Sequence, residues 1–468
     1  MVSSLLYLMK AELMITVIIF ILLFLKLGNR EMKMNSLLNF INILLVLNLA
    51  AGFFNIPNGN LFGDMFRTNE LLTLEKNFLN LGTLIISLQS YHWLQNHKHV
   101  PEFYILLLST LLGMFFMISS NNLLMFYLGL ELSTIPLAAL SNFDLDKRRS
   151  SEAAFKMIIS SAFSSALLLF GISMLYGSTG TLDFAQLLTT LTGNSLQIFS
   201  IILLVAGFGF KISAVPFHLW TADVYEGSPV AVTSYLSVIS KGAILFVMLS
   251  VFYNAFAPMA TTWYNIIFLI SVATMVIGNL FALRQQNMKR FLAFSSIAQV
   301  GFILVGLTGQ SVQGSSSVVY FVLVYIFSNL GAFGVVSLVS ALTGKEKMDD
   351  YKGFYKTNPS LTWVMAISLF SLAGVPPMAG FFGKFFLLFA GAGKGNYLLI
   401  VIAALNMVVA LYYYLKVIKV MFMDANDKPI EKIHGNVQPR IAMAICVGGI
   451  LITGVASGAY NYIYSLLK

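Results

Sequence analysis

The sequence is poor in cysteine and in charged residues. Cys446 is the one cysteine among 468 residues, and only 10% of the residues are Asp, Glu, Lys or Arg. A single cysteine excludes an internal disulfide and any zinc or iron–sulfur site held by several cysteines of this chain. Soluble domains carry about 25% charged residues, so the low charge and the 58% hydrophobic content indicate a membrane protein.

Motifs of soluble catalytic sites are also missing. The sequence shows no CxxC pair, no Gly-rich phosphate loop after a strand and no Ser–His–Asp set. His92, His97 and His99 lie close together in sequence without a cysteine or carboxylate among them, so we expect no metal site there. The net charge of +9 does not predict nucleic-acid binding. Any redox or hydrolytic chemistry is therefore expected in other chains.

Long apolar runs dominate what is present. Each is about 20 residues long, the length of a bilayer-spanning helix, and none alternates as a barrel strand would. Because backbone groups in hydrocarbon must be paired internally, we predict an all-α polytopic membrane protein with about 14 transmembrane helices and no strands. The predicted spans are 11–27, 37–54, 72–94, 103–119, 122–143, 152–176, 196–218, 228–254, 263–283, 288–307, 316–343, 361–391, 397–423 and 438–464.

The cations in the connections are unevenly distributed between the two sides. Of 28 lysines and arginines, 19 fall in alternate connections or in the adjoining span ends on one side, and five do so on the other. The positive-inside rule makes the first side cytoplasmic, which predicts that both termini are periplasmic. The five cations on the periplasmic side are Lys10, Arg67, Lys76, Lys394 and Lys468.

The four remaining cations lie inside predicted spans. They are Lys156, Lys211, Lys241 and Lys384, and one carboxylate, Glu131, lies near the middle of another span. A charge inside a bilayer costs at least ~2.5–3.5 kcal/mol and marks function by default. A buried lysine without a partner can load and release a proton near neutral pH, so these five residues predict a proton path.

Four of the five have alternative interpretations, and for Lys211 and Lys241 the alternative is a permanently charged lysine. Glu131 and Lys156 lie on neighbouring antiparallel helices, so we expect them to pair. The pair could serve only to hold helices together, and Lys156, about a turn inside its helix, could extend to the membrane surface instead.

Proline interrupts two apolar runs. Pro216 lies in the first, and Pro376 and Pro377, flanked by Gly374 and Gly380, lie in the second. Proline removes a helix hydrogen bond and clashes with the preceding turn, so both runs are predicted to be broken helices. An ordinary kink at Pro216 is the alternative.

The two breaks occupy equivalent positions in two sets of five spans. Each is in the fourth span of its set, and because five is odd the sets enter the membrane from opposite faces. This pattern is typical of an inverted-topology repeat. We predict three N-terminal helices in 1–100, a first five-helix bundle in 101–257, a second inverted bundle in 258–424 and a C-terminal helix in 425–468.

Titratable residues follow the first break. His218 could relay protons, although a lone histidine there is also commonly structural. Asp223 and Glu226, in the next connection, are expected to be solvated surface groups.

Several motifs resemble the antiporter-like membrane subunits of bacterial proton-pumping NADH:quinone oxidoreductase, respiratory complex I. The resemblance covers nearly the whole chain and is closest to subunit N. Subunit M usually has glutamate where this chain has Lys384, and subunit L is longer, with an added lateral helix. The motifs are Leu128-Gly129-Leu130-Glu131-Leu132-Ser133, Glu152-Ala153-Ala154-Phe155-Lys156, Val215-Pro216-Phe217-His218-Leu219-Trp220, Asp223-Val224-Tyr225-Glu226-Gly227-Ser228-Pro229, Lys289-Arg290-Phe291-Leu292-Ala293-Phe294-Ser295-Ser296-Ile297-Ala298 and Gly380-Phe381-Phe382-Gly383-Lys384-Phe385.

The resemblance implies a translocase subunit of the bacterial inner membrane that moves protons while other subunits pass electrons from NADH to quinone. It implies that Glu131 pairs with Lys156, that Lys211 and Lys241 form a central relay, and that Lys384 opens toward the periplasm. FMN, iron–sulfur clusters and quinone are expected in partner subunits, which include sister antiporter-like subunits. Where the family commonly has histidine this chain has Gln299, which cannot titrate, so a relay there must use water or bypass the side chain.

Three other functions remain open at this point. A subunit of an Mrp-type cation/proton antiporter would share the same fold and charges, and Na⁺-dependent transport would favour it. A membrane-bound hydrogenase subunit would be accompanied by a nickel-containing soluble arm. A purely structural scaffold would tolerate neutralisation of all five charges.

Overall fold

The computed structural model describes residues 2–28, 33–54, 56–393, 395, 397–456 and 458–468. Helices account for nearly all of the regular structure in these residues, which confirms the predicted all-α class. One exception was not predicted: strands β1 (Gly59–Leu61) and β2 (Phe66–Thr68) form a short antiparallel hairpin. Lys394, one of the cations used for the topology, lies outside the described residues.

Ten helices of the described chain are long and apolar enough to cross a membrane. Helices α2 (Lys10–Leu27) and α4 (Glu70–Gln89) also match predicted spans. The count of 14 transmembrane helices and the inverted repeat stay predictions. The ten are α3 (Met34–Ala51), α6 (Val100–Ile118), α7 (Leu123–Ser141), α8 (Arg148–Thr179), the run Val230–Ala255, the run Ala257–Ala282 that contains α14 (Ala260–Ala282), α15 (Met288–Thr308), α16 (Val312–Thr343), α20 (Tyr397–Phe422) and α21 (Val437–Val455).

Short helices fill several connections and were not predicted separately. The predicted last span, 438–464, is divided between α21 and α22. The short helices are α1 (Val2–Leu8), α5 (Tyr91–Gln95), α9 (Phe184–Thr190), α11 (Leu219–Gly227), α17 (Phe354–Thr357) and α22 (Gly458–Leu467).

The chain packs as two compact units, each assembled from separate segments. The predicted division into four consecutive regions is not tested by these units and stays a prediction. The first unit comprises Met1–Leu84, His97–Ile212 and Ser240–Ile267, and the second comprises Ile85–Asn96, Ser213–Ile239 and Phe268–Lys468.

In the first unit, α6 and α7 approach each other closely. A Cβ added to Gly113 would lie 2.4 Å from the Ser133 backbone N, and one added to Gly129 would lie 2.7 Å from the Met117 N. Small residues allow such contact between membrane helices. The close approach fixes α7, the helix that carries Glu131.

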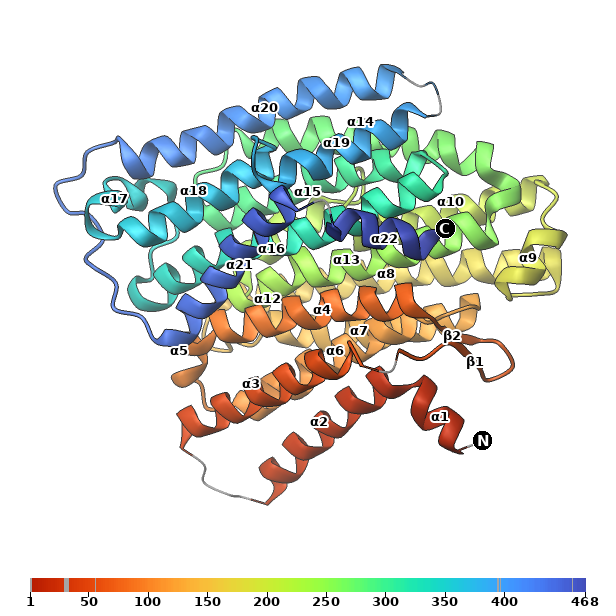
Figure 1. The fold of residues 1–468 in the computed structure, drawn as a ribbon, viewed down its shortest axis with the longest axis horizontal. Helices are drawn as coiled ribbons and strands as arrows, with labels where there is room; N and C mark the ends of the chain where they lie inside the picture. The colour runs from red at the N-terminus through yellow and green to blue at the C-terminus, as the bar shows by residue number, and fades with distance from the viewer. Residues whose placement is uncertain (1, 29–32, 55, 394, 396, 457) are drawn as a thin grey trace. The chain divides into compact units, whose positions relative to one another are not determined.

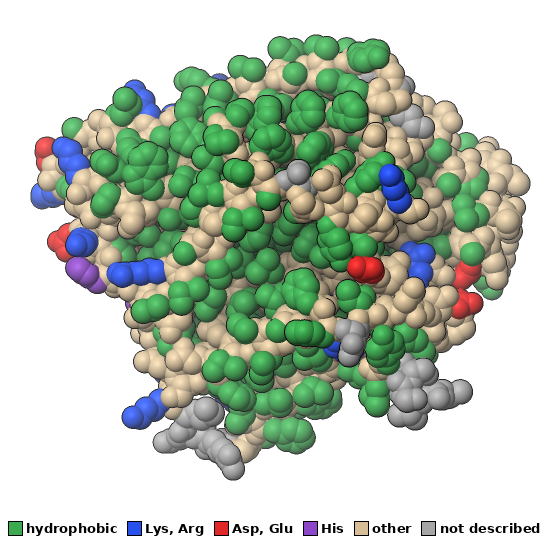
Figure 2. Space-filling view, viewed as in Figure 1, with side chains coloured by type: hydrophobic (Ala, Val, Ile, Leu, Met, Phe, Trp, Pro, Cys, Tyr) green, Lys and Arg blue, Asp and Glu red, His purple; other side chains and the backbone are tan. Residues whose placement is uncertain are grey.

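In the second unit, α16 occupies the centre. It contacts α15, α18 (Pro359–Ala373), α19 (Ala379–Ala392) and α21 (Figure 1). The apolar stretches of α15 and α16 are completely buried, whereas two thirds of the α20 stretch is not. A helix that is apolar on all sides belongs in an interior. Figure 2 shows hydrophobic side chains over much of the visible surface, including that of α20, as expected for contact with lipid tails.

Both proline-containing runs are interrupted. Helix α10 (Ser195–Lys211) ends five residues before Pro216, and Ser213 has a φ of +63°. Helix α18 ends at Ala373, where Gly374 has a φ of +87°, and α19 begins at Ala379. The backbone therefore leaves the helical path within each run, next to one of the predicted lysines.

Gly380 lies within α19 and is not itself part of the interruption. A Cβ there would lie 1.7 Å from the Ser371 carbonyl oxygen. Its N–H donates to Ser371 Oγ at 3.1 Å. The absence of a side chain at Gly380 therefore lets α19 begin directly against the end of α18.

Candidate functional site

Lys384 caps the broken end of α18. Its side chain is completely buried, and Nζ donates to the carbonyl oxygens of Leu372 at 2.7 Å and Ala373 at 3.3 Å. In a continuous helix these carbonyls would accept from the N–H groups four residues later, but those residues are Pro376 and Pro377, which have none. The ammonium thus satisfies oxygens that the prolines leave free, at the helix end where a cation is favoured.

Gln299 shares one of these carbonyls. Its Nε2 donates to the Leu372 oxygen at 2.9 Å and to the Tyr414 hydroxyl at 3.0 Å. Tyr414 is in turn hydrogen bonded to Ser295 Oγ at 2.5 Å. A buried polar chain therefore runs from Ser295 to Lys384 within the second unit.

Lys211 is held in a similar way by neutral oxygens. It is the last residue of α10, and its Nζ donates to Thr134 Oγ1 on α7 at 2.9 Å and to Ser161 Oγ on α8 at 3.1 Å. Glu131, one turn before Thr134, interacts with Lys211 electrostatically. The structure thus brings two of the five predicted residues into one polar region of the first unit.

Lys156 forms an ion pair with a residue other than the predicted Glu131. Its Nζ lies 2.7 Å from Glu152 Oε1, four residues earlier on α8, and its side chain is 39% exposed. Glu131 Oε1 is buried and has no hydrogen-bond partner within the described residues. Pairing between Glu131 and Lys156 stays a prediction.

Lys241 follows an irregular turn of its helix. It is the first residue of α13 (Lys241–Ser250), directly after the π-helical turn Leu236–Ser240, and its side chain is 1% exposed. Single π turns in α-helices are frequent at functional sites. The apolar pattern of the sequence contains no signal for this turn.

His218 is buried at the start of α11. Only 7% of it is exposed, and Nδ1 has no hydrogen-bond partner in the described chain. An imidazole nitrogen in that state can accept or donate a proton. A relay role for His218 is compatible with this environment.

The sequence analysis missed a buried ion pair in the first unit. Glu12 on α2 and Lys76 on α4 are 1% exposed each, and Glu12 Oε1 lies 2.6 Å from Lys76 Nζ. Lys76 had been counted among the periplasmic cations, and the structure pairs it with Glu12 in the protein interior. Glu12 lies in the first turn of α2, so the assignment of Glu131 as the one mid-span acid stays a prediction. Glu75, 3% exposed, is a further buried acid.

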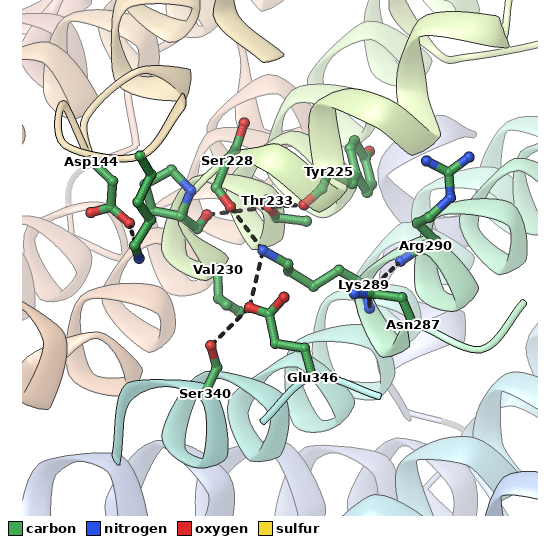
Figure 3. Close-up of polar contacts among 12 residues, drawn as sticks. Asp144, Tyr225, Ser228, Val230, Thr233, Asn287, Lys289, Arg290, Ser340 and Glu346 are labelled. Atoms are coloured by element: carbon green, nitrogen blue, oxygen red, sulfur yellow. Dashed lines mark hydrogen bonds and ion pairs between the residues drawn. The ribbon is translucent and has the colours of Figure 1, made fainter. Parts of the chain in front are cut away.

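A second charged cluster lies in the second unit, where α15 begins. Lys289 Nζ lies 3.1 Å from Glu346 Oε1 and 3.3 Å from the Ser228 carbonyl oxygen, and Ser340 Oγ donates to the same Glu346 oxygen (Figure 3). These contacts tie the start of α15 to the connections after α11 and α16.

The neighbouring arginine corrects another expectation. Arg290 Nη1 lies 2.7 Å from Asp223 Oδ1 and 2.9 Å from Glu226 Oε2. The two acids therefore form ion pairs across α11 and α15, where solvated groups had been predicted.

The histidines near the start of α6 have partners of their own. His97 Nε2 lies 3.1 Å from Asp144 Oδ1, and Lys147 Nζ lies 2.7 Å from Asp144 Oδ2. Burial favours the protonated carboxyl, but His97 and Lys147 outweigh it and lower the pKa of Asp144 to about 2. Among the described residues no group of three His, Cys, Asp or Glu side chains could hold a metal ion.

The chain is similar in sequence to a known protein family and to known proteins. The family described as NADH:quinone oxidoreductase/Mrp antiporter, TM, matches residues 120–410. NADH-quinone oxidoreductase subunit N of Phocaeicola vulgatus is 45% identical over 458 residues, which cover 97% of each chain. These matches confirm the resemblance drawn from the motifs.

Two solved structures share the fold. A chain of respiratory complex I from Thermus thermophilus, solved with bound aureothin, is 27% identical with a TM-score of 0.82, over 96% of this chain and 97% of that one. A chain of the Mrp complex from a Dietzia species has a TM-score of 0.81 over 98% of this chain and 99% of that one, but is only 19% identical and shows the fold alone. The chain belongs to the NADH:quinone oxidoreductase/Mrp antiporter transmembrane family, among the relatives of NADH-quinone oxidoreductase subunit N.

Proposed function

We propose that the chain is a membrane-arm subunit of NADH:quinone oxidoreductase, a translocase that moves protons across the membrane. Its relatives of 45% identity carry the name subunit N of that enzyme. Electron transfer from NADH to quinone takes place in other subunits, where FMN, iron–sulfur clusters and quinone belong. This chain contributes the path for protons.

One observation carries the residue-level proposal: Lys211 and Lys384, each at an interrupted helix, are bound by neutral oxygens. The hydroxyls of Thr134 and Ser161 can donate as well as accept, so they suit Lys211 as an ammonium and as a neutral amine. Lys384 faces two carbonyls, and a neutral amine still has two N–H groups to give them. Both sites therefore accommodate the loss and the return of a proton.

The order of transfer extends this argument. A change in the separation of Glu131 and Lys156 alters the field on Lys211, whose proton passes to Lys241 and then to Lys384. The electrostatic interaction between Glu131 and Lys211 supports the first step. His218 is a further candidate for the relay, and the later steps follow the family resemblance.

Gln299 acts in this scheme as a positioning residue. Its amide cannot exchange a proton as an acid, yet it donates to the carbonyl that also receives Lys384. We infer that it orients the Leu372 carbonyl, while the Tyr414 hydroxyl or water carries any proton that passes this point.

The orientation and the partners complete the proposal. The excess of cations in alternate connections supports a cytoplasmic position for those connections and a periplasmic position for both termini in a bacterial inner membrane. The partners are other membrane-arm subunits, including sister antiporter-like subunits, and the lipid bilayer.

The test uses the assembled complex in proteoliposomes with a pH-sensitive dye. Lys384→Arg keeps a charge that does not dissociate in proteins, and Lys384→Met removes the titratable group. Both variants should lower the number of protons moved per NADH oxidised, whereas Lys416→Arg, at an exposed position of α20, should not. NADH oxidation with a soluble electron acceptor controls for assembly, and wild-type proton yield in both Lys384 variants would exclude the relay.

The same vesicles separate this function from cation/proton antiport. A proton flux that does not depend on Na⁺ but requires NADH supports the proposal. An Na⁺-dependent flux without NADH would favour the Mrp alternative.

A further inference from the structure

A large cavity lies away from the buried lysines, in the second unit. It has a volume of about 1010 Å³ and is bounded by the starts of α18 and α21 and by the connection from α20 to α21. This volume is at the upper end of the range for small-molecule sites. Nothing in the proposed proton path uses it.

One end of the cavity is basic. Lys356, Lys432 and Arg440 line it together with His434, and no aspartate or glutamate does. All three cations are exposed, and none forms an ion pair with a carboxylate of the described residues. The cavity lining therefore carries a net positive charge. Figure 2 shows basic and acidic side chains and a histidine over the α20–α21 connection, but its acidic residues do not line the cavity.

The other walls are apolar and follow the membrane helices. Leu361 and Val364 come from α18, and Met443 and Val447 come from α21. With Arg440 they continue one face of α21, because residues 440, 443 and 447 are spaced by three and four. The same helix face thus passes from a cation in its first turn to apolar side chains deeper in the span.

The connection that closes the cavity is held in place by hydrogen bonds. Asn358 Oδ1 accepts from the Ile433 N–H at 2.8 Å, and its Nδ2 donates to the Glu431 carbonyl at 3.0 Å. Asn436 N–H donates to His92 Nε2 at 2.9 Å. Because the walls are already ordered, a ligand would lose little affinity to loop ordering.

We propose that this cavity binds an anionic phospholipid. The headgroup phosphate lies among Lys356, Lys432 and Arg440, and the acyl chains lie along α18 and α21. Basic pockets at the membrane boundary suit anionic headgroups. Free phosphate would leave the apolar walls uncovered, and a zwitterionic lipid would bring its own cation to a site that already holds three.

The experiment uses the assembled complex and a phosphatidylglycerol with a photoactivatable diazirine in one acyl chain. Mass spectrometry of the labelled chain should place the label on the segments 359–364 and 440–447. Unlabelled phosphatidylglycerol should compete, whereas phosphatidylcholine with the same acyl chains and inorganic phosphate at matched ionic strength should not.

Two variants and one control sharpen the result. Lys432→Gln/Arg440→Gln should lower labelling roughly tenfold or more, given the usual contribution of a basic residue at an anionic surface. Ala444→Phe, at an exposed position of the apolar wall, should lower labelling without any change in charge. Lys416→Gln/Lys419→Gln removes two exposed cations of α20 that do not line the cavity, and labelling should stay at the wild-type level.

Several outcomes would overturn the proposal. Labelling that survives the loss of both cations, or that phosphatidylcholine competes equally well, would show ordinary lipid contact. Competition by inorganic phosphate would indicate a phosphate site. Labelling of a partner protein at this position in place of segments 359–364 and 440–447 would indicate a protein interface.

Discussion

Lys76→Met should destabilise the first unit far more than loss of both charges of its ion pair. Glu12 and Lys76 are 2% exposed in their side chains and 2.6 Å apart. Methionine preserves the length of lysine but leaves the Glu12 carboxylate buried without its cation. Removal of one partner of a buried pair costs about 3–5 kcal/mol, whereas apolar replacement of the pair is often neutral.

The environment of the pair predicts an order among the variants. Lys76 also lies over the rings of Phe66 and Phe115, 5.4 and 5.9 Å from their centroids, and interacts electrostatically with Glu75. Glu12→Gln therefore leaves the Lys76 ammonium with other favourable contacts, so it should reduce stability less than Lys76→Met does. The double variant Glu12→Gln/Lys76→Met should recover much of the stability lost in Lys76→Met, because no uncompensated charge remains buried.

The assay is a double-mutant cycle on the assembled complex in detergent. Loss of about 3–5 kcal/mol corresponds to at least a hundredfold shift in the folding equilibrium, which should appear as a large fall in the temperature of half-inactivation and faster proteolysis. Additive effects of the two substitutions, or a Lys76→Met protein as stable as the double variant, would contradict a direct coupling between these side chains.

Two further predictions concern the same unit. Asp144→Asn should lower stability at neutral pH, because a carboxyl with a folded pKa of about 2 and an unfolded value of about 3.9 stabilises the fold fully above that unfolded value. Thermal denaturation should show the difference from wild type shrinking as the pH falls from about 4 toward 2, and a constant difference would refute this. Gly129→Ala should reduce stability and proton yield, because the new Cβ would lie 2.7 Å from the Met117 N, whereas Gly177→Ala, with nothing within 4 Å, should change neither.

Local signals account for most of the fold that the sequence predicted. Apolar run length located α2, α6 and α20 within a few residues, because a spanning helix needs little else. Proline located both interruptions, because its effect on the backbone does not depend on distant contacts. The π turn before Lys241 carries no such local signal, and the hairpin of β1 and β2 is too short for a periodic pattern.

Partners far apart in sequence could not be predicted in the same way. Glu12 and Lys76 are 64 residues apart, and nothing in either segment indicates which helix faces which. Topology counting grouped Lys76 with the periplasmic cations because it lies near a span end. Asp223 and Glu226 were assigned to solvent because they lie in a predicted connection, although Arg290 is in reach once α11 and α15 are side by side.

At the second helix break, the sequence predicts which carbonyls lose their donors, and the three-dimensional structure determines which group replaces those donors. The prolines of this break determine that the carbonyls of Leu372 and Ala373 lose their helical donors, which can be worked out from the sequence alone. Which group replaces those donors depends on the path of α19. In the structure, Lys384 donates to both carbonyl oxygens, and Gln299 also donates to that of Leu372. At the first break, Lys211 instead donates to hydroxyl groups of α7 and α8. The contacts of Lys384 should therefore depend mainly on its own broken helix. Those of Lys211 should depend mainly on the positions of the neighbouring helices α7 and α8.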